Sequence, residues 1–565
     1  MALRSHGVAS AFGAVLFGSL AIGAAGPVRA AEWTGDPEHH ATLREVISSA
    51  HHPWLHWPEF PWYRDEMVGL YGENADSLVW MRGGKPIPQA AVVIAELGRA
   101  GERGLEPVDY DVELLERNNT ALEKGVELTP REVALHDLAL SLLYMRHVSD
   151  LHIGRVNPRN LGIGIDVEAK KYHVPTLVRR AIAENRMAEV VAEAEPPLVQ
   201  YREMKRLLEA YRSLAAGERF DPLPRVKKLE PGQSYSGVDA LRQRLVFLGD
   251  LAREDSAAVG AAARYDSTLV AAVKRFQGRH GLNADGVIGK GTLAALDVPL
   301  QRRVTQLQLA LERLRWLPDL SARDFIVVNV PGFELYAFDA ANTGAPELRM
   351  PVIVGKSLDT QTPVFQEEMR YIIFRPYWNV PSSITKDELI PKLRKDPSYL
   401  QTEDMEIVGG FADETPALQV NEETLDRLAR GALRIRQRPG PKNALGLIKF
   451  IFPNNNNVYL HSTPSPSLFA RQRRDFSHGC IRVEDPVALA HWVLRDKPEW
   501  THETIATAMG AEESSRVNLS EPLLVLIFYT TAIVNPDGTA SFYEDVYGHD
   551  ARLEAALLRG EPFEP

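Results

Sequence analysis

Apolar residues recur at spacings of three and four through much of the first 220 residues of this chain. The pattern is clearest in Ala90 to Leu97, Val133 to Met145 and Leu177 to Val191. Such spacing places apolar side chains on one face of a helix. Loop-forming residues interrupt the pattern around Gly104 and Gly154. Residues 50–220 are therefore predicted to form a helical scaffold domain, and we assign no chemistry to them.

A compact three-helix module is predicted at residues 232–298. One run of apolar residues ends at Gly249, and a second run, Leu269 to Phe276, leads into a tight turn at Asp285-Gly286. A third short helix fits 292–296. The Leu- and Arg-rich stretch 299–320 is predicted to be a further helix that returns to the scaffold.

The period of the pattern changes after residue 320. Short β-branched and aromatic runs separated by Gly and Pro are typical of strands. They include 325–330, 334–338, 350–355, 371–374 and 458–460. A β-rich, β-sandwich-like catalytic domain is therefore predicted at 324–510. Residues 386–438 return to a charged helical pattern between these strands, and we expect this insert to pack over the site as a lid.

The end of the chain predicts a C-terminal hairpin at 520–550. Leu523 to Tyr529 is an apolar strand, residues 535–538 form a turn, and Ala540 to Tyr543 is the expected partner strand. The whole pattern predicts a multidomain α+β protein.

Composition fits this picture. A length of 565 residues suggests about three or four domains. Hydrophobic residues make up 45% and charged residues 25%, which is ordinary for a soluble globular protein. The net charge of -11 argues against nucleic acid as a partner, because a phosphate-binding surface needs a clustered basic excess.

The first thirty residues are predicted to be a secretory signal peptide. Arg4 and His6 precede a small, apolar run from Val8 to Gly26, and Val28-Arg29-Ala30 has the pattern of a cleavage site. An uncleaved membrane anchor is the alternative, because the run reaches the roughly 18 residues that a span needs. We expect a periplasmic protein, with peripheral membrane association left open.

The most informative residue is Cys480, the only cysteine in the chain. It lies in Ser477-His478-Gly479-Cys480, with His461 upstream. A lone thiol beside glycine and two histidines has the parts of a nucleophilic acyl-transfer site and cannot form an internal disulfide. A buried structural cysteine is the plainer alternative.

The residues around Cys480 suggest separate roles. His461 ends a strand and is the preferred proton acceptor, while His478, two positions before the cysteine, is expected to point the other way and to support substrate or oxyanion. The carbonyl of Ser462 could orient His461, and the amides of Gly479 and Cys480 could stabilise an oxyanion. Arg482, and less directly Arg474, could hold a substrate carboxylate.

Zinc binding by His461, His478 and Cys480 is a competing interpretation. No Cys-x-x-Cys or His-Glu-x-x-His spacing supports it. We therefore predict no metal and no other cofactor.

The chain resembles the L,D-transpeptidases in the string Ser477-His478-Gly479-Cys480 with its upstream histidine. Three further segments extend the likeness to a large periplasmic subgroup with a scaffold, a peptidoglycan-binding module and a lid; they contain Tyr377 to Pro381, Gln437 to Gly440 and Asn443 to Gly446. Val273 to Gln277 and Gly286 to Gly289 resemble the peptidoglycan-binding module. Relatives often carry an acidic residue where this chain has Ser462.

The resemblance implies a function in cell wall biogenesis and cell shape. Cys480 would form a thioester with a stem peptide and make 3,3 cross-links in peptidoglycan, and carbapenems would acylate it. Trp378, Asn443 and Tyr459 are expected to contact the substrate. An L,D-carboxypeptidase, attachment of a wall-anchored lipoprotein, and a non-catalytic wall-binding protein whose 232–298 module binds glycan or only packs on the scaffold remain alternatives.

Overall fold

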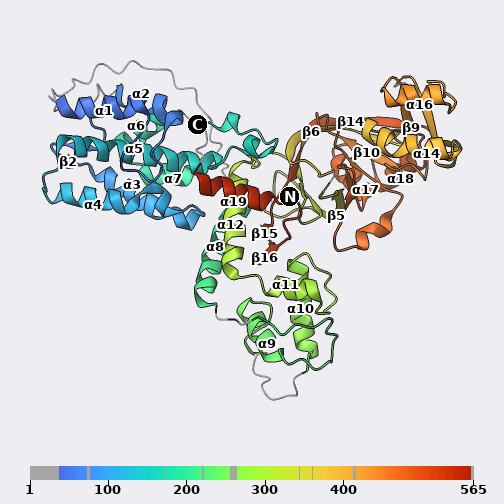
Figure 1. The fold of residues 1–565 in the computed structure, drawn as a ribbon, viewed down its shortest axis with the longest axis horizontal. Helices are drawn as coiled ribbons and strands as arrows, with labels where there is room; N and C mark the ends of the chain where they lie inside the picture. Colours follow the sequence, from blue (N-terminus) through green and yellow to red (C-terminus); the bar gives the residue numbers. More distant parts are fainter. Residues whose placement is uncertain are drawn as a thin grey trace, which may run out of the picture.

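The computed structural model describes residues 37–560 except 73–76, 172, 219, 221, 255–263, 343, 359 and 411–414. The predicted signal peptide, residues 1–30, lies outside the described residues. A helical N-terminal part, a strand-rich part with the lid, and a small helical module form three lobes (Figure 1). This arrangement confirms the α+β class. No helix among the described residues is both long enough and apolar enough to cross a membrane.

The scaffold is a helical lobe built around the long central helix α5. Its helices are α1 (Pro37–Ser49), α2 (Arg64–Gly72), α3 (Pro88–Gly98), α4 (Val112–Glu123), α5 (Pro130–Ile153), α6 (Val174–Glu184) and α7 (Met187–Ala194), with a small ribbon of β1 (Met81–Arg82) and β2 (Lys85–Pro86). Thr129 and Glu132 form a capping box at the start of α5. Its side chains are buried on nearly all sides, as expected of a helix that its neighbours enclose.

Two packed helices, α8 (Val199–Gly217) and α12 (Leu300–Arg315), connect the lobes. The buried Glu312 of α12 accepts hydrogen bonds from the amides of Arg155 and Val156 at 2.5 and 3.0 Å. On the other side, Arg313 lies 2.6 Å from Asp550 of α19 (His549–Arg559). The helix predicted within 299–320 thus ties the scaffold to the C-terminus of the chain.

The small module contains α9 (Val238–Phe247), α10 (Ser267–Arg279) and α11 (Lys290–Leu296), packed around an apolar core of their own. Gly286 permits the turn before α11: its φ is +75°, and a Cβ there would lie 2.8 Å from Val270.

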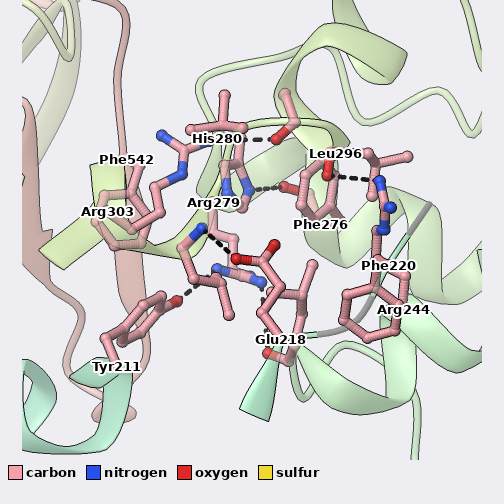
Figure 2. A pocket seen from close by; sticks show the side chains of 14 residues that line it. Tyr211, Glu218, Phe220, Arg244, Phe276, Arg279, His280, Leu296, Arg303 and Phe542 are labelled. Carbon is pink, nitrogen blue, oxygen red and sulfur yellow. Dashed lines mark hydrogen bonds between the residues drawn. The ribbon is translucent and has the colours of Figure 1, made fainter. Parts of the chain in front are cut away.

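A cluster of polar and aromatic side chains joins the module to its neighbours (Figure 2). We call it the joint; it includes Tyr211, Arg279, Arg303 and Phe542. Arg279, at the end of α10, donates to Asp250 at 2.7 Å and to the hydroxyl of Tyr211 on α8 at 3.3 Å. The guanidinium of Arg303 on α12 lies 4.7 Å from the ring centre of Phe542. The module therefore packs against the connecting helices.

The strand-rich lobe is a closed barrel. Its nine strands are β3 (Phe325–Asn329), β4 (Glu334–Phe338), β5 (Leu348–Gly355), β6 (Phe365–Phe374), β10 (Ile448–Ile451), β11 (Leu460–His461), β12 (Asp475–Ser477), β13 (Ile481–Val483) and β14 (Ser515–Phe528). They run in the order β12-β5-β13-β11-β10-β6-β14-β3-β4, and a further pairing of β4 with β5 closes the sheet. Inward-facing apolar side chains fill the interior. Helices α17 (Pro486–Val493) and α18 (His502–Gly510) pack beside it.

The predicted partner of the strand at 523–529 is wrong. This strand belongs to β14, which lies between β6 and β3 in the barrel. The hairpin instead joins β15 (Ala532–Val534) to β16 (Ala540–Phe542) around the predicted turn. The end of β14 is buried on both faces, which suits a central strand better than one arm of an isolated hairpin.

The insert between β6 and β10 is a separate small unit with its own apolar core. Besides the predicted helices it contains a three-stranded antiparallel sheet. Its elements are β7 (Trp378–Asn379), α13 (Ser382–Ile384), the π-helical turn η7 (Thr385–Leu389), α14 (Ile390–Lys395), α15 (Tyr399–Thr402), β8 (Met405–Val408), α16 (Glu422–Ala429) and β9 (Arg434–Gln437). We call this unit the insert.

Candidate active site

Three neighbouring strands place charged and titratable side chains in one row across the outside of the barrel. Lys449 of β10 pairs with His461 of β11, which pairs with Arg482 of β13. Alternate residues of a strand face opposite sides of a sheet. The intervening residues Ile448, Phe450, Leu460 and Ile481 are buried in the barrel core. The row therefore faces outward on a rigid support.

Cys480 lies one residue before β13, beside Tyr459. The amide of Ile481 donates to the carbonyl of Tyr459 at 3.1 Å and fixes this alignment. Interaction with the Tyr459 side chain acts to lower the pKa of the Cys480 thiol, and interaction with Trp378 of the insert acts to lower the pKa of Tyr459. The thiol also lies 3.6 Å from the carbonyl oxygen of Asn457. Tyr459 and Trp378, both predicted to bind substrate, thus lie in the surroundings of Cys480, the candidate nucleophile.

Burial raises the pKa of the Cys480 thiol. Hydrogen bonds from Tyr459 and the charges of Lys449 and Arg482 oppose this effect but do not outweigh it. The sulfur is therefore protonated at rest, and attack on a substrate requires a base.

His461 has the properties of that base. Its Nδ1 lies 2.6 Å from the carbonyl oxygen of Ser462. A carbonyl can only accept, so Nδ1 carries the hydrogen and Nε2 keeps its lone pair. Burial, followed by the charge of Arg482, lowers the pKa of His461 to about 3, so the ring is neutral near pH 7.

The Ser462 carbonyl is itself held in place. The hydroxyl oxygen of Ser462 accepts a hydrogen bond from the amide of Leu447 at 2.7 Å, which fixes the residue. Gly446, with φ +64°, lets the backbone lie close to this hydroxyl, because a Cβ at 446 would lie 2.0 Å from the Ser462 hydroxyl oxygen. The contact that the sequence predicts between Ser462 and His461 is thus present and supported from behind.

The predicted oxyanion role of Gly479 competes with a hydrogen bond of its amide. Its amide donates to the hydroxyl of Ser477 at 3.1 Å, so the N–H is already engaged. Among the residues that the structure describes, the amide of Cys480 has no hydrogen-bond acceptor and is the better candidate donor. Glycine is nevertheless needed at 479, where φ is +109°.

Thr362 supports the Gly479 turn and was not predicted. Its hydroxyl donates to the carbonyl of Gly479 at 2.8 Å and accepts from the amide of Gly355 at 2.9 Å. It lies on the loop between β5 and β6, and nothing in its own sequence neighbourhood signals this role.

His478 faces the insert. Its Nε2 lies 3.0 Å from Glu388 of η7, and both side chains are partly exposed. This agrees with the expectation that His478 points away from the thiol, and it connects the cysteine string to the insert.

Lys449 and Arg482 lie on either side of His461 in the row. The Nε of Arg482 is buried and has no hydrogen-bond partner, and neither Arg482 nor Lys449 forms an ion pair among the described residues. Burial lowers the pKa of Lys449 to about 8. Sequence analysis missed Lys449, because a lone polar residue in an apolar strand usually only marks the solvent side. Two unpaired cations beside a thiol suit an anionic substrate group.

Arg474 and Asn443, both predicted to contact the substrate, are engaged with backbone carbonyls. Arg474 donates to the carbonyls of Val352, Arg471 and Phe333 at 2.9 to 3.2 Å. The fully buried Asn443 donates to the carbonyls of Pro376 and Arg438, both at 3.0 Å. Most of these carbonyls lie in irregular segments, where the side chains supply hydrogen-bond donors. The described residues also contain no group of three or more His, Cys, Asp or Glu side chains placed to hold a metal.

Comparisons with known proteins match three parts of the chain. Residues 323–508 match the model described as "L,D-transpeptidase catalytic domain", residues 65–208 the "Scaffold domain", and residues 234–296 the "Putative peptidoglycan binding domain". The first match contains the whole row described above.

One curated relative and one solved structure are similar to the chain. A protein of Haemophilus influenzae named "Putative L,D-transpeptidase" is 30% identical over 259 residues, which cover 46% of this chain. The chain spans about half of that relative's length, 51%. The crystal structure of an L,D-transpeptidase from Xylanimonas cellulosilytica is 17% identical, with a TM-score of 0.17, and the match covers 54% of this chain and 99% of that one. A superposition this poor adds nothing on the fold. Residues 323–508 thus form a catalytic domain of the L,D-transpeptidase family, which this chain combines with a scaffold domain and a peptidoglycan-binding domain.

Proposed function

We propose that this protein is an L,D-transpeptidase that forms 3,3 cross-links in peptidoglycan through a thioester on Cys480. One observation carries the proposal: a buried, neutral histidine with a fixed tautomer lies on the strand beside the chain's only thiol. Such a pair is the minimum equipment for covalent acyl transfer.

In the first half-reaction, the sulfur attacks the carbonyl carbon of the third residue of a tetrapeptide stem while Nε2 of His461 takes the thiol proton. The C–N bond to the terminal D-alanine breaks, and its amine takes the proton from His461. The amide of Cys480 would donate to the oxyanion, and Arg482 would bind a carboxylate of the stem.

In the second half-reaction, the side-chain amine of a third residue on a neighbouring stem attacks the thioester. His461 takes the amine proton, the C–S bond breaks, and the proton returns to sulfur. A wall-anchored lipoprotein would enter at the same step, through an amine of its own. Water in place of the amine would give an L,D-carboxypeptidase.

The remaining parts of the chain fit this reaction. The peptidoglycan-binding domain would hold the glycan, and the insert, which touches the site through Trp378 and Glu388, would close over the stem peptide. Peptidoglycan lies outside the cytoplasmic membrane, so we place the protein in the periplasm, with residues 1–30 as its export signal.

The test is mass spectrometry of purified tetrapeptide muropeptides incubated with the wild-type chain and with Cys480→Ala. A dimer lacking one D-alanine, formed by the wild type alone, supports the proposal. A tripeptide monomer would replace it with the carboxypeptidase, and muropeptides left unchanged by the folded wild type would leave only wall binding. Cross-linking that is undiminished in a folded Cys480→Ala variant would overturn the role of Cys480. Gln472→Ala, an exposed change just before β12, is the control.

A further inference from the structure

We propose that Asn454 is a positioning residue that holds the backbone carbonyl of Asn457 against the Cys480 thiol, so that the resting enzyme keeps the proton on its sulfur. The inference rests on the proposed use of Cys480 as the attacking group. It gives a role to the loop between β10 and β11, which the sequence did not single out.

The side chain of Asn454 uses its full hydrogen-bonding capacity inside this loop. Its Nδ2 donates to the carbonyls of Phe452 and Val458 at 2.6 and 2.7 Å. Its Oδ1 accepts from the amides of Asn456 and Val458 at 3.0 and 3.2 Å. An asparagine side chain has two donor hydrogens and two acceptor lone pairs, so none of this capacity remains for a ligand. The role of Asn454 is therefore to fix the path of the backbone.

The fixed loop places the carbonyl of Asn457 beside the candidate nucleophile. The Cys480 thiol donates a hydrogen bond to this carbonyl, with 3.6 Å between sulfur and oxygen. Asn457 has a φ of +54°, in the left-handed region that asparagine tolerates better than most residues. Its side chain is exposed, so this residue meets the thiol through its backbone.

This contact favours the protonated sulfur. A carbonyl oxygen can only accept a hydrogen bond, so the hydrogen must be on sulfur. A hydrogen bond that is made only by the neutral form of a group makes ionisation less favourable. A thiol has one hydrogen, and while it faces Asn457 it is not donated to Nε2 of His461. Before attack, the S–H group must turn from the carbonyl to the base.

Charged and titratable groups approach the sulfur from several elements. They are Lys449 of β10, Tyr459 and His461 at β11, Arg482 of β13, and the pair of His478 and Glu388 at the insert. The cations favour the thiolate, and the carbonyl of Asn457 acts against them. Alkylating and oxidising agents attack the thiolate, not the thiol. A proton held on sulfur thus protects the only cysteine of the chain between turnovers.

A different use of the same carbonyl is to accept a hydrogen bond from an amide of the stem peptide. Turning the carbonyl away would then raise the KM for muropeptides and leave the titration of the thiol in the free enzyme unchanged. The two uses therefore separate in an experiment without substrate.

The experiment measures the rate of cysteine alkylation of the full chain by iodoacetamide between pH 6 and 10. The midpoint of the pH profile reports the acidity of the thiol, and the plateau at high pH reports its accessibility. Asn457→Val disfavours the φ of +54° and should turn the carbonyl away. We expect the midpoint to fall by about 0.5 to 1 unit, which raises the thiolate fraction near pH 7.5 about three- to tenfold. Asn457→Gly accepts the same φ and should leave the midpoint unchanged.

Asn454→Ala should lower the midpoint in the same direction, because it removes the four hydrogen bonds that fix the loop. The exposed change Asn455→Ala, in the same loop, is the matched control. Equal shifts in Asn457→Gly and Asn457→Val would overturn the proposal. So would midpoints that stay in place or rise in folded Asn457→Val and Asn454→Ala, whatever happens to the plateau rate. If the midpoints fall as expected but no cross-linked muropeptide forms, the proposed function fails and this inference stands.

Discussion

The Nδ1 of His461 lies 2.6 Å from the carbonyl oxygen of Ser462, the next residue in the chain. The orientation of the base is thus set by the backbone rather than by an acidic side chain. Because no carboxylate stabilises the protonated ring, burial dominates and the pKa falls to about 3.

This pKa predicts the acid side of the pH profile. His461 must be neutral to accept a proton, and with a folded pKa of about 3 it is neutral throughout the range above pH 4.5. We expect kcat/KM for muropeptides to show no inflection near the ordinary histidine pKa of about 6.5. A clear inflection there, in stopped assays from pH 4.5 to 8, would contradict this role. His461→Gln should lower kcat about 10²- to 10⁴-fold.

Thr362→Val should disturb the site from a distance. The change leaves the Gly479 carbonyl and the Gly355 amide without their partner in a fully buried place, at a cost of about 1 to 3 kcal/mol. Urea unfolding should show this loss of stability, and alkylation of Cys480 should slow in the folded variant. Thr362→Ser keeps the hydroxyl and is the control; equal losses in both variants would point to packing instead.

Glu388→Gln tests the contact between the insert and the cysteine string. The ion pair with His478 is about 40% exposed on both sides, so the melting temperature should hardly change. If the contact helps to close the insert over the stem peptide, KM for muropeptides should rise severalfold. Glu422→Gln, an exposed change elsewhere on the insert, is the control and should leave KM unchanged. An unaltered KM in Glu388→Gln would separate the contact from catalysis.

His136 of α5 makes the scaffold sensitive to acid. Its ring is fully buried, both nitrogens lack hydrogen-bond partners among the described residues, and burial lowers its pKa to about 4. The unfolded chain therefore binds the proton more tightly, and stability falls as the pH drops below about 6.5. His136→Leu should gain up to about 2 kcal/mol relative to wild type at pH 5 compared with pH 7.5. The exposed His56→Gln should show no such difference; an equal gain for His136→Leu at both pH values would contradict the titration.

The candidate nucleophile and its candidate base can be named from the sequence because their signal is local. One cysteine, its glycine and a histidine at the end of a strand are visible within a short stretch. The fold class follows from the change of period near residue 320.

Residues that act through the register of the barrel were not predictable. Lys449 lies beside His461 and Tyr459 only because β10 pairs with β11, and Thr362 lies 117 residues before the glycine whose carbonyl it holds. Arg474 and Asn443 show a different difficulty. A polar side chain near a motif resembles a ligand contact in sequence, whereas irregular loops need the same groups for their own carbonyls.

The joint in Figure 2 has a consequence for the proposed cross-linking reaction. Arg279 at the end of α10 donates a hydrogen bond to Tyr211 of α8, and Arg303 of α12 lies over the ring of Phe542 in β16. These contacts hold the module in a defined position beside the barrel. A glycan strand held by the module would then present its stem peptides at a set spacing from the cysteine. The distance between the module and the thiol, which the joint sets, would then decide which stem peptide along a glycan strand reacts.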